Sequence, residues 1–177
     1  KQKMLSLDNT YSFKELKDWD ERVHKGLGRG AKVEYVAELK IDGLSANITY
    51  KSGKMIIGAT RGDGETGEDV TQNIKTIRAI PLILLGKNIP ELIEIRGEVY
   101  MDKNEFEIIN KEREIEGEVL FANPRNAASG SLKLLDTGLV AKRKLNFFAH
   151  SLGEYKGEEI RSQWEFFEKL KSQNFPL

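Results

Sequence analysis

Val36-Ala37-Glu38-Leu39-Lys40-Ile41-Asp42-Gly43 alternates between apolar and polar side chains up to its final glycine. Such alternation is typical of a half-buried strand, and it predicts a β-strand over residues 34–41. Successive side chains of a strand point to opposite faces, so Glu38, Lys40 and Asp42 would share one face, spaced by about 7 Å. Gly43 would then free the backbone to turn. A lysine held on a rigid strand between two carboxylates is well placed to act as a nucleophile.

A charged row on a strand can also be an ordinary solvated surface, and this alternative stays open while the stretch is taken alone. A second stretch, residues 93–100, repeats the pattern. Its polar face carries Glu94, Arg96, Glu98 and Tyr100, opposite Ile93, Ile95 and Val99. Two strands that turn charged groups in the same direction predict a polar cleft lined by a β-sheet.

The composition is that of an ordinary globular chain, with 177 residues, 39% hydrophobic and 32% charged. This length is enough for one domain with its own core, and no apolar run approaches the roughly 18 residues of a membrane span. The chain has no cysteine, which excludes disulfides and thiolate zinc sites from it and fits a reducing compartment. Because the formal net charge is zero, any contact with nucleic acid would need a local basic patch.

Capping and turn residues divide the rest of the chain into helices and strands. Ser12 and Glu15 have the spacing of a capping box, and Asn123-Pro124 places an N-cap before a proline at the first helical position. The pattern predicts helices over 12–23, 68–75, 102–116, 123–134 and from 162 onward, and further strands over 44–50, 55–61, 93–101 and 145–152. Since strands and helices come in clumps, we expect an α+β fold with mainly antiparallel sheets flanked by helices. Trp19 and Trp164 are expected to be core residues.

The loop Gly62-Asp63-Gly64-Glu65-Thr66-Gly67 fits the pattern G-x-G-x-x-G of dinucleotide-binding proteins. Its carboxylates would repel a pyrophosphate, and the strand before it belongs to a predicted hairpin rather than to a parallel crossover. We therefore reject a dehydrogenase-like binder and interpret the segment as an acidic glycine loop that positions Arg61.

Six blocks of the chain, taken together and in order, closely resemble the adenylation (nucleotidyltransferase) domain of bacterial NAD-dependent DNA ligases. They are residues 4–9 (MLSLDN), 38–44 (ELKIDGL), 60–71 (TRGDGETGEDVT), 78–82 (RAIPL), 96–99 (RGEV) and 121–132 (FANPRNAASGSL). Lys-x-Asp-Gly alone is a weak signal that ATP-dependent ligases and RNA capping enzymes share, whereas six ordered blocks are specific. The ATP-using enzymes usually carry arginine two residues after the glycine; Ser45 at that position favours the NAD branch.

The resemblance implies that Lys40 attacks the adenylyl phosphate of NAD, releases nicotinamide mononucleotide and forms lysyl-AMP. The AMP would pass to the 5′-phosphate of a nick in double-stranded DNA, and the 3′-hydroxyl would then displace it and seal the strand. The resemblance also implies Mg²⁺, with no metal ligand assigned here, and Zn²⁺ only in a domain outside this chain. We expect a cytoplasmic monomer without membrane contact.

Carried over residue by residue, the resemblance assigns catalysis to Lys40 and to Asp42, which would orient Lys40 or assist its proton loss. The nucleotide-binding residues would be Ser6 and Leu7 in the adenine pocket, Glu38 at the exocyclic amine, Glu98 at a ribose hydroxyl and Arg61 at ribose or phosphate. Arg125 and Lys133 would contact phosphate of the nucleotide or of the nick, although Lys133 replaces the family's usual arginine and cannot bind bidentately.

Each role has a structural alternative. Arg61 and Glu98 could form a cross-strand ion pair, and Arg125 could cap a helix or pair with an acid. His24 and His150 match no catalytic position of the family and are interpreted as structural.

Relative to the family, residues 1–177 correspond to part of an adenylation domain. The helical subdomain that binds the nicotinamide half of NAD would precede Met4, and further phosphate-binding lysines would follow the last matching block. We therefore expect little or no self-adenylation by these residues alone. Two other functions remain open, an ATP-using ligase or capping-type nucleotidyltransferase and a non-catalytic module that binds nicks.

Overall fold

The computed structural model describes residues 4, 8–28 and 30–175. They divide into two compact units, an N-terminal unit, Met4–Ala37, and a main unit that begins at Glu38. Ser6 and Leu7 lie outside the described residues.

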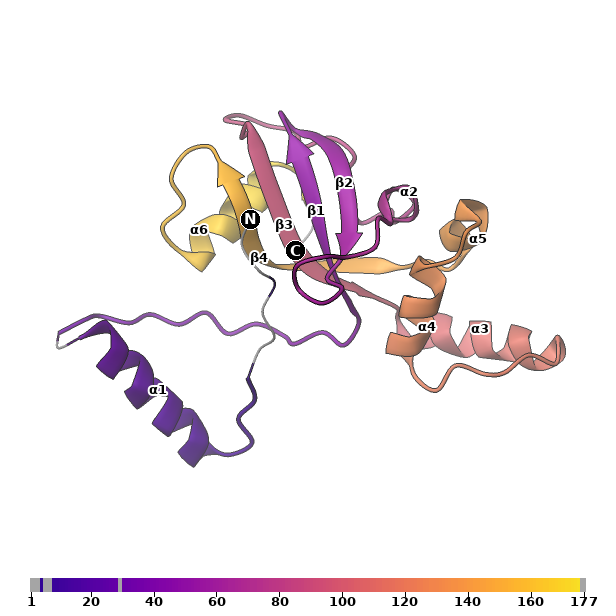
Figure 1. The fold of residues 1–177 in the computed structure, drawn as a ribbon, viewed down its shortest axis with the longest axis horizontal. Helices are drawn as coiled ribbons and strands as arrows, with labels where there is room; N and C mark the ends of the chain where they lie inside the picture. The colour runs from indigo at the N-terminus through magenta and orange to yellow at the C-terminus, as the bar shows by residue number, and fades with distance from the viewer. Residues whose placement is uncertain (1–3, 5–7, 29, 176–177) are drawn as a thin grey trace. The chain divides into compact units, whose positions relative to one another are not determined.

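A four-stranded antiparallel sheet forms the centre of the main unit (Figure 1). Its strands are β1 (Leu44–Lys51), β2 (Lys54–Thr60), β3 (Leu92–Tyr100) and β4 (Asn146–Lys156). The strand order is β2-β1-β3-β4, and each neighbouring pair is antiparallel. The predicted α+β class with an antiparallel sheet is confirmed.

The β1–β2 hairpin turns at Ser52 and Gly53, as the sequence predicts. Both residues have positive φ angles, 47° and 78°, which is the backbone twist that two-residue hairpins favour. The tight turn fixes the register of β1 against β2, with Ala46 opposite Thr60. The end of β2, followed by Arg61, is thereby held beside the start of β1.

One face of the sheet is apolar and forms the core. Ile48, Tyr50, Ile93, Ile95 and Val99 are fully buried there. Phe175, beyond the last helix, packs edge-on against Tyr50 and Phe147. The alternate residues of the same strands point to the other face, which leaves the polar side chains of β1, β3 and β4 together on it.

The part of the chain that the structure describes contains six helices, of which α1 belongs to the N-terminal unit and the others to the main unit. They are α1 (Phe13–Leu27), α2 (Thr71–Ile74), α3 (Lys103–Ile115), α4 (Pro124–Leu132), α5 (Thr137–Lys142) and α6 (Gln163–Ser172). Predicted N-caps are confirmed where Ser12, Asn123 and Ser162 accept hydrogen bonds from backbone N–H groups. In Figure 1, α6 lies beside β4, and α3, α4 and α5 are grouped at one side of the sheet.

Two helix predictions need correction. The helix predicted over 68–75 shrinks to α2, because Glu68 and Val70 form backbone hydrogen bonds with Thr60 and Gly58 of β2 instead. The helix α5 was not predicted; it follows Asp136, whose carboxylate caps the N–H of Gly138.

The strand predicted over 34–41 is wrong: these residues have no regular secondary structure. Ala37 and Leu39, expected on a buried face, are exposed, Leu39 by 75%. A strand needs a ladder partner, and residues 34–41 take part in none of the pairings of the sheet. The alternating pattern of residues 34–41 therefore belongs to a segment without regular secondary structure and not to a strand.

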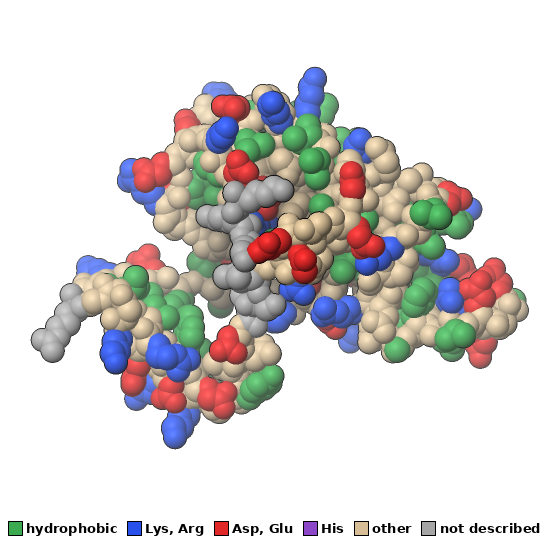
Figure 2. Space-filling view, in the orientation of Figure 1, with side chains coloured by type: hydrophobic (Ala, Val, Ile, Leu, Met, Phe, Trp, Pro, Cys, Tyr) green, Lys and Arg blue, Asp and Glu red, His purple; other side chains and the backbone are tan. Residues whose placement is uncertain are grey.

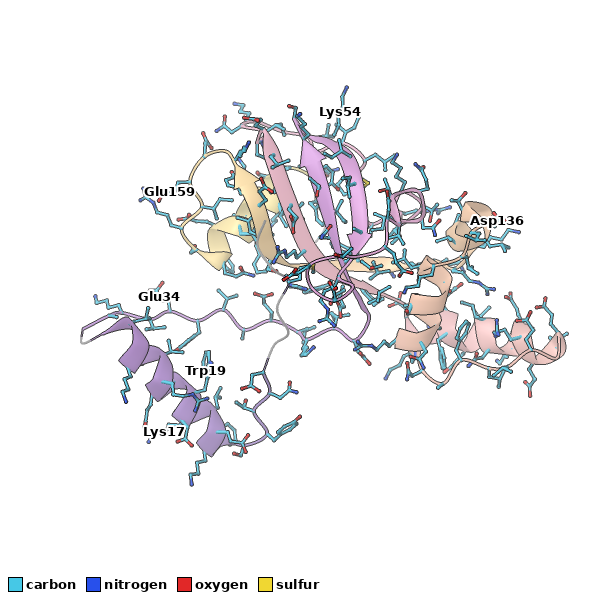
Figure 3. The ribbon with its side chains drawn as sticks, viewed as in Figure 1. Lys17, Trp19, Glu34, Lys54, Asp136 and Glu159 are labelled. Carbon is cyan, nitrogen blue, oxygen red and sulfur yellow. The ribbon has the colours of Figure 1, made fainter. Side chains whose placement is uncertain are left out.

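The expected core tryptophans also differ from the prediction. Trp164 on α6 is 63% exposed, because Phe166 and Leu170 supply the buried side of that helix. Trp19 on α1 packs against Tyr35 within the N-terminal unit, with ring centroids 5.2 Å apart (Figure 3), and remains 38% exposed.

The surface mixes charges of both signs, as the zero net charge predicts (Figure 2). Within the described residues, each helix is too short or too polar to cross a bilayer.

Candidate active site

Lys40 projects from a tight turn rather than from a strand. The backbone N–H of Ile41 donates to the carbonyl of Leu39 at 3.1 Å, which closes a three-residue turn with Lys40 at its centre. The side chain of Lys40 is exposed. The lysine is therefore presented by a turn and not by a strand. Because side chains alternate between two faces only in a strand, the prediction that Glu38 and Asp42 share one face with Lys40 loses its basis.

Gly43, which ends the motif, lies against β3. A Cβ atom at this position would stand 2.2 Å from the carbonyl oxygen of Val99 and 3.1 Å from Cγ of Glu98. Gly43 is not among the glycines with positive φ, so the glycine is required for close backbone approach and not for a turn. This approach brings the segment that carries Lys40 to Glu98.

Glu98 occupies the polar face of β3 and is only 9% exposed. Ser45 lies directly opposite it on β1 and donates its hydroxyl to Oε2 of Glu98 at 2.7 Å. The backbone N–H of Arg61 donates to the carbonyl of Ser45 at 2.9 Å. The strand order therefore brings Arg61 and Glu98 to either side of Ser45.

His150 is a site residue that the sequence did not reveal. The β3–β4 register passes from Ala149 opposite Gly97 to Ser151 opposite Arg96, so His150 is the extra residue of a bulge. Burial lowers the pKa of His150 below its ordinary value; the carboxylates of Glu98 and Glu38 raise it, and the charges of Lys40 and Arg96 lower it further. The imidazole is therefore within electrostatic reach of these four charged groups.

Gln163, the first residue of α6, is a second residue that sequence reasoning missed. Its Nε2 atom donates to Oε1 of Glu38 at 2.8 Å and to the backbone carbonyl of His150 at 2.6 Å. Glu38 is thereby tied to the bulge of β4 across 125 positions of sequence. No local sequence pattern predicts this contact, because it depends on the packing of α6 beside β4.

Asp42 and Arg125 form an ion pair, with Nη1 and Oδ1 separated by 2.9 Å. Arg125 stands in the first turn of α4, and both side chains are half-exposed or more. The alternative that Arg125 pairs with an acid is the one observed. That acid is itself a predicted catalytic residue.

Lys133, at the C-terminal end of α4, pairs with Glu68. Both residues line a groove of about 580 Å³ beside α2 and α5. The structure thus provides Lys133 with a carboxylate partner and does not link it by a described contact to Glu38 or Glu98.

The acidic glycine loop is closed on itself. The carboxylate of Asp63 accepts the N–H groups of Glu65 and Thr66 at 2.9 and 2.7 Å, and these bonds lower the pKa of Asp63. These two N–H groups are therefore already engaged, which agrees with the rejection of a dinucleotide-binding loop. The N–H of Gly64 donates to the carbonyl of Arg61, so the loop does support Arg61.

The position of Lys40 near His150 can be tested without any activity. We expect Lys40→Met to raise the pKa of His150, because a nearby positive charge that disfavours the imidazolium is removed, and Glu98→Gln to lower it. An NMR pH titration resolves the site, since the chain has only two histidines, His24 and His150. Lys54→Met, at the exposed start of β2, is the matched control. If the pKa of His150 is the same in Lys40→Met as in the unmodified protein, the placement of Lys40 near His150 is wrong.

A preassembled metal site is not found among the described residues, which hold no group of three or more His, Asp or Glu side chains suited to a metal ion. Three acids predicted for the site accept hydrogen bonds from protein side chains instead: Glu38 from Gln163, Glu98 from Ser45 and Asp42 from Arg125.

Comparison with known proteins identifies the family of the chain. The profile of the family described as "NAD-dependent DNA ligase adenylation domain" matches residues 1–177. Proteins named DNA ligase are 54% identical over 98% of the chain in Thermodesulfovibrio yellowstonii, 51% over 97% in Brevibacillus brevis and 49% over 97% in Gloeobacter violaceus. The chain spans about a quarter of the length of these curated relatives, 25–26%. It belongs to the family of NAD-dependent DNA ligase adenylation domains.

Proposed function

We propose that the protein is an NAD-dependent DNA ligase in which Lys40 carries AMP from NAD to a DNA nick. One observation carries the proposal most: the close approach of Gly43 to Val99 and Glu98 brings the segment that carries Lys40 to the polar face of the sheet, where Ser45 holds Glu98. A single amine among acceptors and cations is suited to a nucleotide, which offers amine and hydroxyl donors together with phosphate charge.

The proposed first step uses the Nζ atom of Lys40 as the nucleophile. Nζ attacks the phosphorus of the adenylyl group, so that an N–P bond forms while the P–O bond of the pyrophosphate bridge breaks. Nicotinamide mononucleotide leaves with its phosphate, and the lysine nitrogen loses a proton. An amine suits this step because the phosphoramidate remains reactive enough to pass AMP onward to the 5′-phosphate of the nick.

The nucleotide would be bound by acceptors around Lys40. We propose that Glu38 accepts from the exocyclic amine of adenine and that Glu98 accepts from a ribose hydroxyl. The fixed position of Glu98 supports this role, because Ser45 holds one carboxylate oxygen and burial restricts the side chain. Arg61 would contact ribose or phosphate, and Ser6 and Leu7 would complete the adenine pocket.

Asp42, Arg125 and Lys133 would serve the phosphate chemistry. The Asp42–Arg125 ion pair supports a linked role, since any phosphate that binds Arg125 competes with Asp42 for the guanidinium. Asp42 would then be released to orient Lys40 or to assist its proton loss. Lys133 would donate to phosphate in the same way once its pairing with Glu68 opens.

A metal ion and the cellular setting complete the proposal. Mg²⁺ characteristically binds through one or two carboxylates together with substrate phosphates, so the described acids do not form a site for it before the nucleotide is present. We therefore assign no step to a metal held by this chain. We propose that the protein acts in the cytoplasm, as a monomer, on nicked double-stranded DNA, with Zn²⁺ only in a separate domain.

The experiment that tests this function is mass spectrometry of the full-length protein after exposure to NAD. We expect a mass increase of one adenylyl group, mapped to the peptide that contains Lys40 and removed by adding nicked DNA. Parallel exposure to ATP separates the NAD-using enzyme from an ATP-using nucleotidyltransferase. Nick binding without any adduct from either nucleotide would instead identify a non-catalytic module.

A further inference from the structure

We propose that Gln163 is a positioning residue that orients Glu38 and thereby sets the preference of the site for adenine over a base that lacks the amine. The inference rests on the proposed function, in which Glu38 contacts the adenine, and it assigns a role to a residue outside all six sequence blocks. The geometry that carries it is the double donation of Nε2 to Oε1 of Glu38 and to the carbonyl of His150.

Gln163 is held on a rigid base. The helix α6 starts at this residue, and the hydroxyl of Ser162 caps it by accepting from the N–H of Glu165 at 3.1 Å. Phe166 and Leu170, on the buried side of α6, are excluded from solvent and anchor the helix to the core. The side-chain amide of Gln163 is therefore a fixed donor, because its backbone and its helix are both fixed.

Glu38, by contrast, lies on a segment without regular structure and is exposed. An exposed carboxylate on such a segment samples several rotamers, and a ligand that needs one of them would have to restrict the others. The hydrogen bond from Gln163 restricts the rotamers of Glu38 before a ligand binds. The carbonyl of His150 fixes the amide from the other side, so Glu38 is tied to the bulge that also holds the imidazole.

The bond leaves a defined acceptor for the base. A carboxylate has two oxygens, and Gln163 engages Oε1, so Oε2 can accept a hydrogen bond from a ligand amine. An adenine ring offers an exocyclic amine there, whereas hypoxanthine offers a carbonyl oxygen that a carboxylate repels. Discrimination between the two bases therefore depends on how firmly the carboxylate is held.

The test compares NAD with nicotinamide hypoxanthine dinucleotide in the full-length protein and in Gln163→Met, which keeps the length and helix propensity of the side chain but removes the donor. We expect the KM for NAD to rise about five- to tenfold, the scale of one ordinary hydrogen bond. The kcat should change little, and the kcat/KM preference for NAD over the hypoxanthine analogue should fall by the same factor.

Controls separate a positioning role from a structural one. Glu168→Gln, on the exposed side of the same helix, should leave both KM and base preference unchanged. The pair Glu38→Gln and Gln163→Met forms a double-mutant cycle, in which we expect strong non-additivity in base preference because Gln163 acts through Glu38. Thermal unfolding of each variant shows whether the fold is retained.

The outcomes are distinct. An unchanged base preference in Gln163→Met, or additive effects in the cycle, would overturn the inference and leave the proposed function intact, with Gln163 reduced to a clamp on the His150 carbonyl. If the unmodified protein forms the adduct without preferring adenine, the role of Glu38 fails and the inference fails with it. If the unmodified protein forms no adduct at all, the proposed function itself is refuted.

Discussion

Lys40→Arg abolishes the AMP adduct formed from NAD, by roughly 10³-fold or more, as expected when a nucleophile is removed. Arginine keeps the positive charge and nearly the same length, but its guanidinium stays protonated and has no free electron pair with which to attack phosphorus. Because Lys40 is exposed at the centre of a turn, the substitution should leave the fold unchanged. The measurement is quantitative mass spectrometry of the intact full-length protein after exposure to NAD.

A matched control for this variant is Lys54→Arg, at the hairpin end of β2 (Figure 3). Lys54 is also exposed, and its substitution should leave adduct formation at the level of the unmodified protein. Retained adduct in Lys40→Arg would show that another residue is the nucleophile. Loss of adduct in Lys54→Arg would instead indicate that the assay responds to lysine replacement in general.

Gly43→Ala lowers both stability and adenylation, because a single methyl group would collide with the backbone of β3. The added Cβ would lie 2.2 Å from the carbonyl oxygen of Val99, a rigid ladder group that cannot rotate away. We expect a loss of about 1–3 kcal/mol in the free energy of unfolding, the usual scale of overpacking. The segment that carries Lys40 must shift, and displacement by about 1 Å can reduce a rate roughly 10²-fold.

Chemical denaturation and single-turnover adenylation measure the two effects separately. Gly26→Ala is the control, since a Cβ there would have no neighbour within 4 Å and Gly26 lies inside α1, where alanine favours the helix. A Gly43→Ala protein with unchanged stability and unchanged adduct formation would contradict the close approach to Val99. If Gly43→Ala loses adenylation activity but keeps its free energy of unfolding, the substitution acts only by displacing Lys40.

The two variants address different parts of one motif. Lys40 supplies the reactive atom, and Gly43 allows the segment to reach Glu98 on β3. The sequence suggested that the glycine frees a turn after a strand. In the structure the turn lies earlier, at Leu39–Ile41, and the glycine serves contact with the sheet.

Local signals predicted the elements whose stability is local. The capped helices α1, α4 and α6 start where Ser12, Asn123 and Ser162 indicate, and the hairpin turns at Ser52-Gly53. Each of these features depends on residues within a few positions of one another, and their chemistry can therefore be recognised in the sequence. The apolar face of β3 was predicted for the same reason, since Ile93, Ile95 and Val99 alternate along the strand and are fully buried, although Arg96 and Glu98 on the polar face are buried too.

The predictions that were wrong concern features that depend on contacts between distant parts of the chain. Residues 34–41 alternate as a strand does, but a strand forms only where a neighbouring strand offers hydrogen bonds, and these residues pair with none of the four strands. Trp164 was expected in the core, whereas the packing of α6 buries Phe166 and Leu170 and leaves Trp164 exposed. In both cases the outcome depends on distant parts of the chain.

By itself the sequence determined the α+β class and the family blocks and supplied the candidate side chains, because capping, hairpin turns and motif spacing act over short distances along the chain. Only the tertiary structure decided which of those side chains meet: that Ser45 holds Glu98, that Arg125 pairs with Asp42, and that His150 and Gln163 join Glu38. The contacts to Glu98, Asp42 and Glu38 join residues 53 to 125 positions apart, and strand order, a bulge in β4 and the packing of α6 bring them together. No local pattern encodes such distances, since they arise from burial of one shared core.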